Sequence, residues 1–172
     1  HVITPFSRPH LLNPLLTLFT PQNVVWHLIA HDLKDIPKSL PDWVHVYYCT
    51  TYNSLSDPCY WKLNWFLDTV GLLPNARYGV ICDDDAFQPD YFNRLRCQGW
   101  IPNIITSKDF GRGWGGFIAA PENMRVTRVG FQFWTLGECL SQHRFAIDNC
   151  GADGIMASTL SSRYETTYLP EA

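Results

Sequence analysis

Short runs of apolar, often β-branched residues recur along the first half of the chain, and polar or helix-like segments separate them. Runs of this kind, bounded by turn signals, are typical of buried strands. The sequence predicts strands at residues 2–5, 24–30, 44–48 and 78–82, the first of them closed by Pro5. Two further strands are predicted in the second half, at residues 101–106 and 164–169, and residues 117–120 fit a strand or a buried turn.

Helical signals lie between several of these strands. Apolar residues recur at helical spacing over 11–19. Asp57 before Pro58 is a capping residue followed by proline at the first helical position, so a helix should run from there to a stop near Gly71. The alternation of strand and helix predicts an α/β domain with a mostly parallel central sheet flanked by helices.

The second half of the chain is less regular. A short helix is expected to open at Pro89, and residues 153–161 have a helical pattern. Residues 122–150 show no clear period, although 138–143 could be helical. With 172 residues in all, we expect one domain with a core large enough to stand alone.

Composition narrows the possible partners. Thirteen basic and sixteen acidic residues give a formal net charge of −3, which argues against a general nucleic-acid binder. No stretch approaches the ~20 apolar residues of a membrane span. The chain begins at His1 rather than Met, so we expect it to be a part of a longer protein. Its localisation stays open, with a soluble cytoplasmic domain as one expectation.

The six cysteines contain no C-x-x-C pair and match no zinc spacing. Their even number permits disulfides, but the chain is not a short cysteine-dense one. We expect mostly free, buried thiols, which behave as small hydrophobes.

Three consecutive carboxylates, Asp83, Asp84 and Asp85, follow the strand at 78–82. Adjacent anions repel one another, and no Lys or Arg lies within the next eight residues. A divalent cation that prefers oxygen ligands, Mg²⁺ or Mn²⁺, would neutralise them. Ligands of open α/β sheets bind outside the carboxyl ends of the strands, which fits this position. The alternative is an acidic turn that closes a strand.

Glycine is concentrated at residues 111–116, with Arg112 and Trp114 between the glycines. Such a segment allows a backbone to approach a ligand closely. It fits neither the P-loop nor the dinucleotide-binding pattern, and a flexible turn is the alternative.

Several motifs, in order, resemble those of nucleotide-diphosphosugar glycosyltransferases of the GT-A fold, in particular the large inverting family of polysaccharide-type enzymes. Residues 2–9 resemble that family's first strand and its Pro-Thr-Tyr-x-Arg-Pro opening, and Asp32 stands where the second strand ends in an acidic residue. The triplet at 83–85 resembles the Asp-x-Asp motif, and Asp153 resembles the last residue of an acidic pair that opens a helix. Ala152 replaces the first acid of that pair, and the family's Gln-x-x-Arg-Trp acceptor motif is absent.

The resemblance implies a GT-A-type, Rossmann-like sandwich with a nucleotide-binding half at 1–92 and an acceptor and sugar half at 93–172. It implies transfer of a sugar from a nucleotide-sugar donor, in particular a UDP-sugar, to a glycan, protein or lipid acceptor, with Mn²⁺ or Mg²⁺ at Asp83 and Asp85. The metal would neutralise the leaving diphosphate. The general base of an inverting reaction would be Asp153, with Asp148 as the neighbouring alternative.

The resemblance also implies a set of donor contacts. These are Pro5, Arg8, Asp32, Lys62, Asp83, Asp84 and Trp114, and Asn64 lies beside Lys62 on the helix that precedes the central strand.

Each assignment has a plainer alternative. Arg8 and Lys62 could be surface charges, Asp32 a turn residue and Asp153 a helix N-cap. His27, His45 and His143 carry no ligand spacing and are expected to be structural.

Two other functions stay open. One is a non-catalytic GT-A-like module that binds a sugar or a nucleotide, and the other is a Mg²⁺-dependent nucleotidyltransferase or phosphohydrolase. The sequence does not decide between inverting and retaining transfer.

Overall fold

The computed structural model describes residues 1–6, 12, 16, 24–30, 36, 38–49, 58–81, 103–107, 132–147 and 152–170. The strands are β1 (Val2–Phe6), β2 (Trp26–Ala30), β3 (Val44–Tyr48), β4 (Arg77–Ile81), β5 (Asn103–Ser107), β6 (Gln132–Leu136) and β7 (Thr166–Pro170). The helices with defined bounds are α2 (Pro58–Thr69), α4 (Gly137–Leu140) and α5 (Ala152–Arg163). In the described part of the chain, no helix has the length and apolar character needed to cross a membrane.

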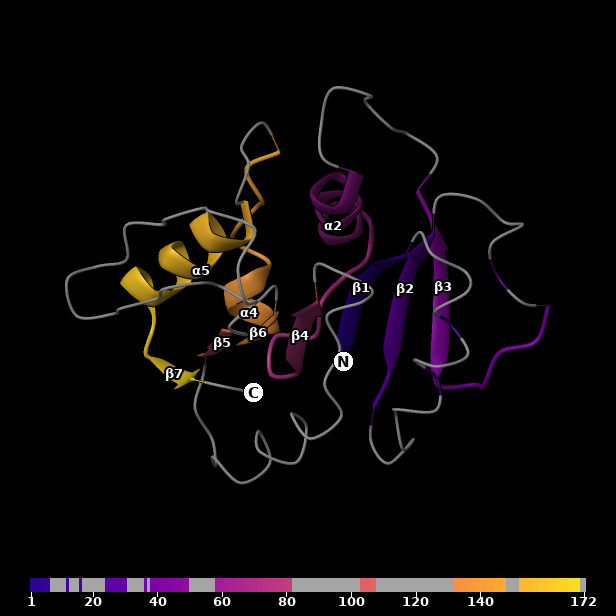
Figure 1. Cartoon of the computed structure of the whole chain (residues 1–172), viewed down its shortest axis with the longest axis horizontal. Coiled ribbons are helices and arrows are strands. Elements are labelled where there is room, and N and C mark those ends of the chain that lie inside the picture. The colour runs from indigo at the N-terminus through magenta and orange to yellow at the C-terminus, as the bar shows by residue number, and fades with distance from the viewer. Residues whose placement is uncertain are drawn as a thin grey trace.

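The strands form one mixed sheet in the order β3-β2-β1-β4-β6-β5-β7 (Figure 1). Neighbours are parallel from β3 through β2 and β1 to β4, and β5 is parallel to β7. Among the described strands, β6 alone runs against its neighbours, β4 and β5. The predicted α/β class is confirmed. One half of the sheet, β3-β2-β1-β4, is parallel, and in the other half the antiparallel strand β6 lies between β4 and β5.

Most predicted elements are present with small shifts at their ends. The strand at 44–48 and the helix start at Pro58 fall where the sequence predicts them. The expected helix at 138–143 is shorter, because α4 ends at Leu140 and a turn follows. The prediction missed β6, whose apolar run lacks the alternation of a half-buried strand. The expected elements at 89–99 and 117–120 lie outside the described residues.

The part of the sheet whose side chains are described is covered on both faces. One face carries α2, α4 and α5 (Figure 1), and we call its core the helix-face cluster. Its buried members are Ile3, Ile29, Cys49, Tyr60, Leu63, Phe66, Leu67, Tyr78, Val80, Leu136, Cys139, Leu140, Phe145, Ala152, Met156 and Leu160. The opposite-face cluster consists of Val2, Phe6, Leu12, Trp26, Leu28, Val44 and Trp134. In β1 and β2, neighbouring residues such as Val2 and Ile3, or Leu28 and Ile29, belong to different clusters, as the pleat requires.

Helix α5 joins the core through one stripe of its surface. Ala152, Met156 and Leu160 are buried in the helix-face cluster and recur every four positions, which places them on one side of a helix. Two cysteines lie in the same cluster, because Cys49 and Cys139 are free and buried. For these two residues, the expectation of free, buried thiols is confirmed.

Gly79 of β4 permits a close cross-strand contact. It pairs with Trp134 of β6, and a Cβ atom at residue 79 would lie 2.5 Å from the Trp134 ring. A glycine inside a strand often marks such an approach. The indole therefore packs directly on the β4 backbone in the opposite-face cluster, and a larger residue at position 79 would force this ring to shift.

We expect Gly79→Ala to lower the free energy of unfolding by about 1–3 kcal/mol, because the added methyl group overpacks the contact with Trp134. Urea denaturation followed by tryptophan fluorescence measures this change. Gly71→Ala is the matched control, since a Cβ atom there meets nothing within 4 Å. It should change stability by less than ~1 kcal/mol. Equal stability of the two variants would contradict this account of Gly79.

Candidate functional site

The order of the first four strands creates a topological switch point between β1 and β4. From β1 the chain adds β2 and then β3 on one side, and it returns to place β4 on the other side. All four strands are parallel, so their carboxyl ends meet at one edge of the sheet. Ligands of open α/β sheets bind outside the carboxyl ends of the strands at such a switch point. The carboxyl ends of β1 and β4 are therefore the candidate site.

The pairing between β1 and β4 stops before the end of β1. The ladder between β1 and β4 contains Val2↔Gly79 and Ile3↔Val80, whereas the ladder between β1 and β2 continues to Phe6↔Ala30. Strand β1 thus keeps its contact with β2 while its last three residues have no partner in β4.

Pro5 explains where the pairing stops. The Val2 N–H donates to Val25 O on the β2 side, and the His1 carbonyl accepts from the Gly79 N–H on the β4 side, both at 2.8 Å. Because backbone groups alternate along a strand, residue 5 faces β4, and proline has no N–H to donate there. The predicted strand end at Pro5 is wrong by one residue, since β1 continues to Phe6 along β2. The buried Pro5 instead ends the pairing with β4.

Lys62 brings a basic side chain to this edge. Its Nζ donates a 3.1 Å hydrogen bond to the carbonyl of Phe6, the last residue of β1. Helix α2 packs over β1, and Lys62 is only 4% exposed. Burying an ammonium group is costly unless the group is hydrogen-bonded or paired. The hydrogen bond to Phe6 therefore helps to hold the Lys62 side chain at the end of β1. The alternative of an ordinary surface lysine is wrong.

The other predicted site residues are placed by the sequence at the ends of the same strands. Arg8 follows the end of β1 by two positions, Asp32 follows β2 by two, and Asp83 follows β4 by two. The side chains of Arg8, Asp32, Asp83, Asp84, Asp85 and Trp114 lie outside the described residues, as does Asp148. Among the residues that are described, no group of three His, Cys, Asp or Glu side chains could hold a metal ion.

Asp153 lies in the first turn of α5. The helix begins at Ala152, so Asp153 is already inside it, and the N-cap alternative is wrong. The side chain of Asp153 lies outside the described part of the chain. Ala152 is fully buried in the helix-face cluster.

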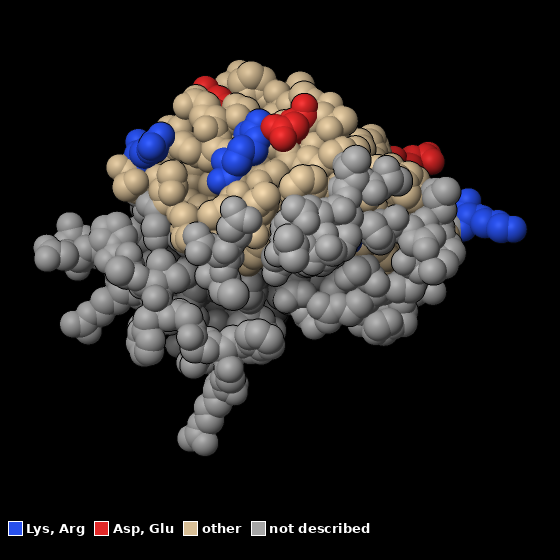
Figure 2. All heavy atoms as spheres, turned by 90° about the horizontal axis from the view of Figure 1, so that it is seen from above, with Lys and Arg blue, Asp and Glu red and all other residues tan. Residues whose placement is uncertain are grey.

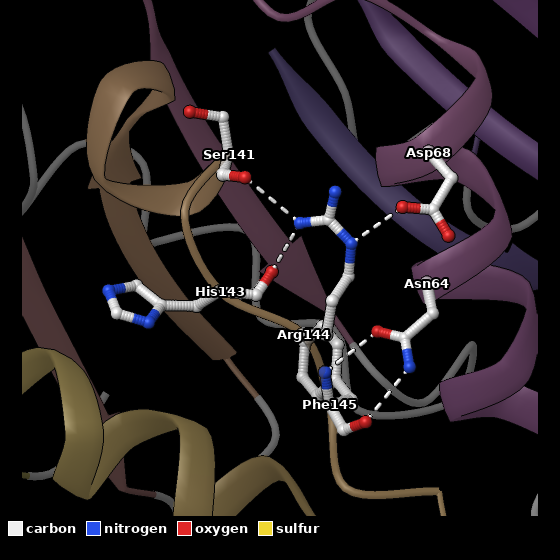
Figure 3. Close-up of polar contacts among 6 residues, drawn as sticks. All are labelled: Asn64, Asp68, Ser141, His143, Arg144 and Phe145. Atoms are coloured by element: carbon white, nitrogen blue, oxygen red, sulfur yellow. Dashed lines mark hydrogen bonds and ion pairs between the residues drawn. The ribbon is translucent and has the colours of Figure 1, made fainter.

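Asn64 contacts the backbone of Phe145, which the sequence did not predict (Figure 3). Its Nδ2 donates to the Phe145 carbonyl at 2.9 Å, and its Oδ1 accepts from the Phe145 N–H at 2.7 Å. We call this pair of bonds the Asn64 clasp, and each bond contributes about 1 kcal/mol net. Both ends of the amide are used, which argues against the donor contact suggested for Asn64. The two residues are 81 positions apart, so no local pattern could have revealed the clasp.

One turn further along α2, Asp68 binds Arg144 (Figure 3). The Arg144 Nε lies 2.7 Å from Asp68 Oδ1, and its guanidinium also donates to the carbonyls of Ser141 and His143. The side chains of Arg144 and Asp68 are 40% and 63% exposed, so their ion pair adds little to stability. The Asn64 clasp is the stronger link between α2 and this segment.

His27 is held in an aromatic cluster on the helix face, near the amino end of β2. Its Nδ1 lies 3.1 Å from the Tyr47 hydroxyl and its Nε2 lies 2.9 Å from His1 Nδ1, and the ring packs against Phe66. Burial, with smaller effects of His45 and the N-terminal charge, lowers the pKa of His27 to about 4. The imidazole is therefore neutral in the folded protein at neutral pH.

His143 also has structural contacts, since its Nε2 lies 3.1 Å from the Tyr164 hydroxyl. Burial lowers the pKa of His143, and Arg163 and Arg144 add to the effect. His45 is exposed. The contacts of His27 and His143 fit the structural role expected for them.

Charged side chains on the helix-bearing face are dispersed. Figure 2 shows that the described Lys, Arg, Asp and Glu residues there stand apart or beside a residue of opposite sign. Within the described residues, this face offers no patch of one sign that would attract a charged partner.

Comparison of the sequence with protein-family models finds no matching family, and comparison with curated proteins finds no match.

The pKa of His27 predicts a loss of stability in mild acid. Between the unfolded value of 6.5 and about 4, the unfolded chain binds a proton at this residue that the folded chain does not. The contribution of His27 to the free energy of unfolding is therefore fully present above pH 6.5. It is lost as the pH drops through this window, by up to ~3 kcal/mol. Urea denaturation at several pH values between about 7 and about 4 measures the slope.

His27→Gln should flatten this slope, whereas His45→Gln should reduce it only in part, because His45 adds a smaller effect to the burial that lowers the pKa of His27. His143 is present in both variants and contributes equally to both. A wild-type slope in His27→Gln would show that the burial of His27 does not cause the acid sensitivity.

Proposed function

We propose that the chain is a metal-dependent glycosyltransferase that transfers a sugar from a nucleotide-sugar donor, in particular a UDP-sugar. One observation carries the proposal. The three motifs that suggested a donor site directly follow the carboxyl ends of three adjacent parallel strands, β2, β1 and β4, on both sides of the switch point. The strand order brings together the three strand ends that these motifs follow, at the edge where α/β sheets bind ligands.

The residue types at this edge suit a nucleoside diphosphate. In our proposal Asp32 binds the base, Pro5 and Arg8 flank the base and ribose, and Trp114 lies against the sugar. Asp83 and Asp85 hold Mn²⁺ or Mg²⁺, and Asp84 binds sugar hydroxyls. Carboxylate oxygens are the ligands that these hard cations prefer. When bound, the ion would act as a Lewis acid on the leaving diphosphate.

Lys62 supports the same proposal from a separate element. Its buried ammonium stands at the end of β1, beside the strand that leads into the Asp triplet. Three adjacent carboxylates need positive charge nearby, and the sequence offers none within the eight residues that follow them. We assign Lys62 the role of a fixed positive charge that favours the anionic donor and lowers the repulsion among the aspartates.

The burial of Ala152 weakens the alternative of a non-catalytic module. That alternative rests on alanine in place of the first acid of the pair. Because Ala152 is fully buried among apolar side chains, a carboxylate there would be desolvated at high cost. Alanine at this position is explained by packing, and Asp153 keeps the role of general base that we propose for an inverting reaction.

The first test is calorimetry of the wild-type chain with UDP, with and without Mn²⁺. We expect UDP to bind more tightly when Mn²⁺ is present. Asp85→Ala should weaken the Mn²⁺-dependent binding at least about tenfold, the equivalent of ~1.4 kcal/mol, because it removes a metal ligand.

Asp42→Asn is the matched control, since Asp42 is an exposed carboxylate that precedes β3 at the opposite edge of the sheet. It should bind UDP as the wild type does. The proposal fails if no nucleoside diphosphate binds, or if Asp85→Ala binds as well as Asp42→Asn. Release of phosphate or pyrophosphate from a nucleotide substrate would instead identify a phosphohydrolase or a nucleotidyltransferase.

Asp153→Asn tests the general base. Loss of the base should lower kcat for sugar transfer by about 10²–10⁴-fold while the affinity for UDP stays the same. The measurement is UDP release from a UDP-sugar with acceptor present. Glu138→Gln, at an exposed position of α4, should retain wild-type turnover. Equal turnover of Asp153→Asn and the wild type would exclude Asp153 as the base, and UDP binding without any turnover in the wild type would favour the non-catalytic module.

A further inference from the structure

The Asn64 clasp joins two parts of the chain that have different roles in the proposed function. Asn64 lies on α2, which also carries Lys62. Phe145 lies on the segment that leads from α4 to α5, and α5 carries Asp153 in its first turn. A helix on the donor side of the proposed site is thus fixed to the segment that precedes the proposed base.

Phe145 is held on α2 by its side chain as well as by its backbone. The ring is buried and stacks on Tyr60, with centroids 5.7 Å apart and planes 21° from parallel. Tyr60 lies one helical turn before Asn64, so the two residues contact Phe145 from the same side of α2. The segment therefore has little freedom to slide or to turn at Phe145.

Seven positions separate Phe145 from the start of α5 at Ala152. Ala146 and Ile147 pack against the helix-face cluster, in which Ala152 and Tyr60 are buried. The clasped segment and the first residue of α5 thus pack into the same core.

We propose that Asn64 is a positioning residue that fixes the first turn of α5, and with it Asp153, relative to the donor edge of the sheet. The consequence for catalysis rests on the proposed function, whereas the coupling between α2 and α5 does not. A displacement of a catalytic group by about 1 Å can lower a rate by about 100-fold, so a residue remote from the chemistry can control turnover.

The test compares Asn64→Ala with Asp68→Ala. Both substitutions remove a polar contact between α2 and the segment 141–145, but Asp68 contributes only the exposed ion pair with Arg144. Asn64→Ala should lower kcat about 10- to 100-fold while the Kd for UDP with Mn²⁺ stays within about twofold of the wild type. Asp68→Ala should change neither quantity.

Amide hydrogen exchange provides a readout that needs no activity. The Phe145 N–H reports the clasp directly, and the Met156 N–H reports the first turn of α5, because it donates to the Ala152 carbonyl in a regular helix. Both amides should exchange faster in Asn64→Ala, whereas in Asp68→Ala they should exchange as in the wild type. Faster exchange at Phe145 with unchanged exchange at Met156 would overturn the proposal, because the clasp would then be local.

The outcomes separate this proposal from the proposed function. A wild-type chain that binds no nucleoside diphosphate contradicts the function, and the exchange rates still decide whether Asn64 couples α2 to α5. A wild-type chain that transfers sugar while Asn64→Ala keeps the wild-type kcat contradicts the positioning role and leaves the function standing.

Discussion

The early end of the pairing between β1 and β4 is the constraint on which the rest of the arrangement depends. Strand β1 lies inside the sheet, and it keeps its ladder with β2 to Phe6 but leaves β4 after Ile3. Pro5 faces β4 without an N–H group, so the ladder cannot continue there. Among the described residues, the ladder between the two strands therefore stops before the end of β1, where Lys62 reaches the Phe6 carbonyl from α2.

Helix α2 connects this edge to the rest of the fold. Its apolar residues Leu63 and Phe66 fill the helix-face cluster, and its polar residues make specific bonds at other positions. Lys62 binds the end of β1, and Asn64 binds the segment before α5. The two residues are separated by one position and point to different parts of the chain, because successive positions on a helix are rotated by about 100°. One helix thus links the edge that follows the parallel strands to the start of α5.

Much of the fold could be predicted because its signals are local. The apolar run at 44–48 and the Asp57-Pro58 helix start are readable from adjacent residues, and so is the alternation that implies a parallel sheet. The strand β6 was missed because its described residues Trp134, Thr135 and Leu136 are all buried, without the alternation of buried and exposed positions that marks a half-buried strand. Pro5 was read as the end of a strand, although in the sheet it ends the pairing with only one of two neighbours.

The sequence by itself determined the α/β class and the position of acidic and basic motifs just after three strands, since hydrophobic period, caps and residue order are properties of neighbouring residues. Only the tertiary structure decided which strands are adjacent, that Lys62 is buried at the end of β1, and that Asn64 binds Phe145. These features depend on contacts between residues 56 and 81 positions apart. Such contacts arise from the packing of whole elements, and no local pattern encodes them.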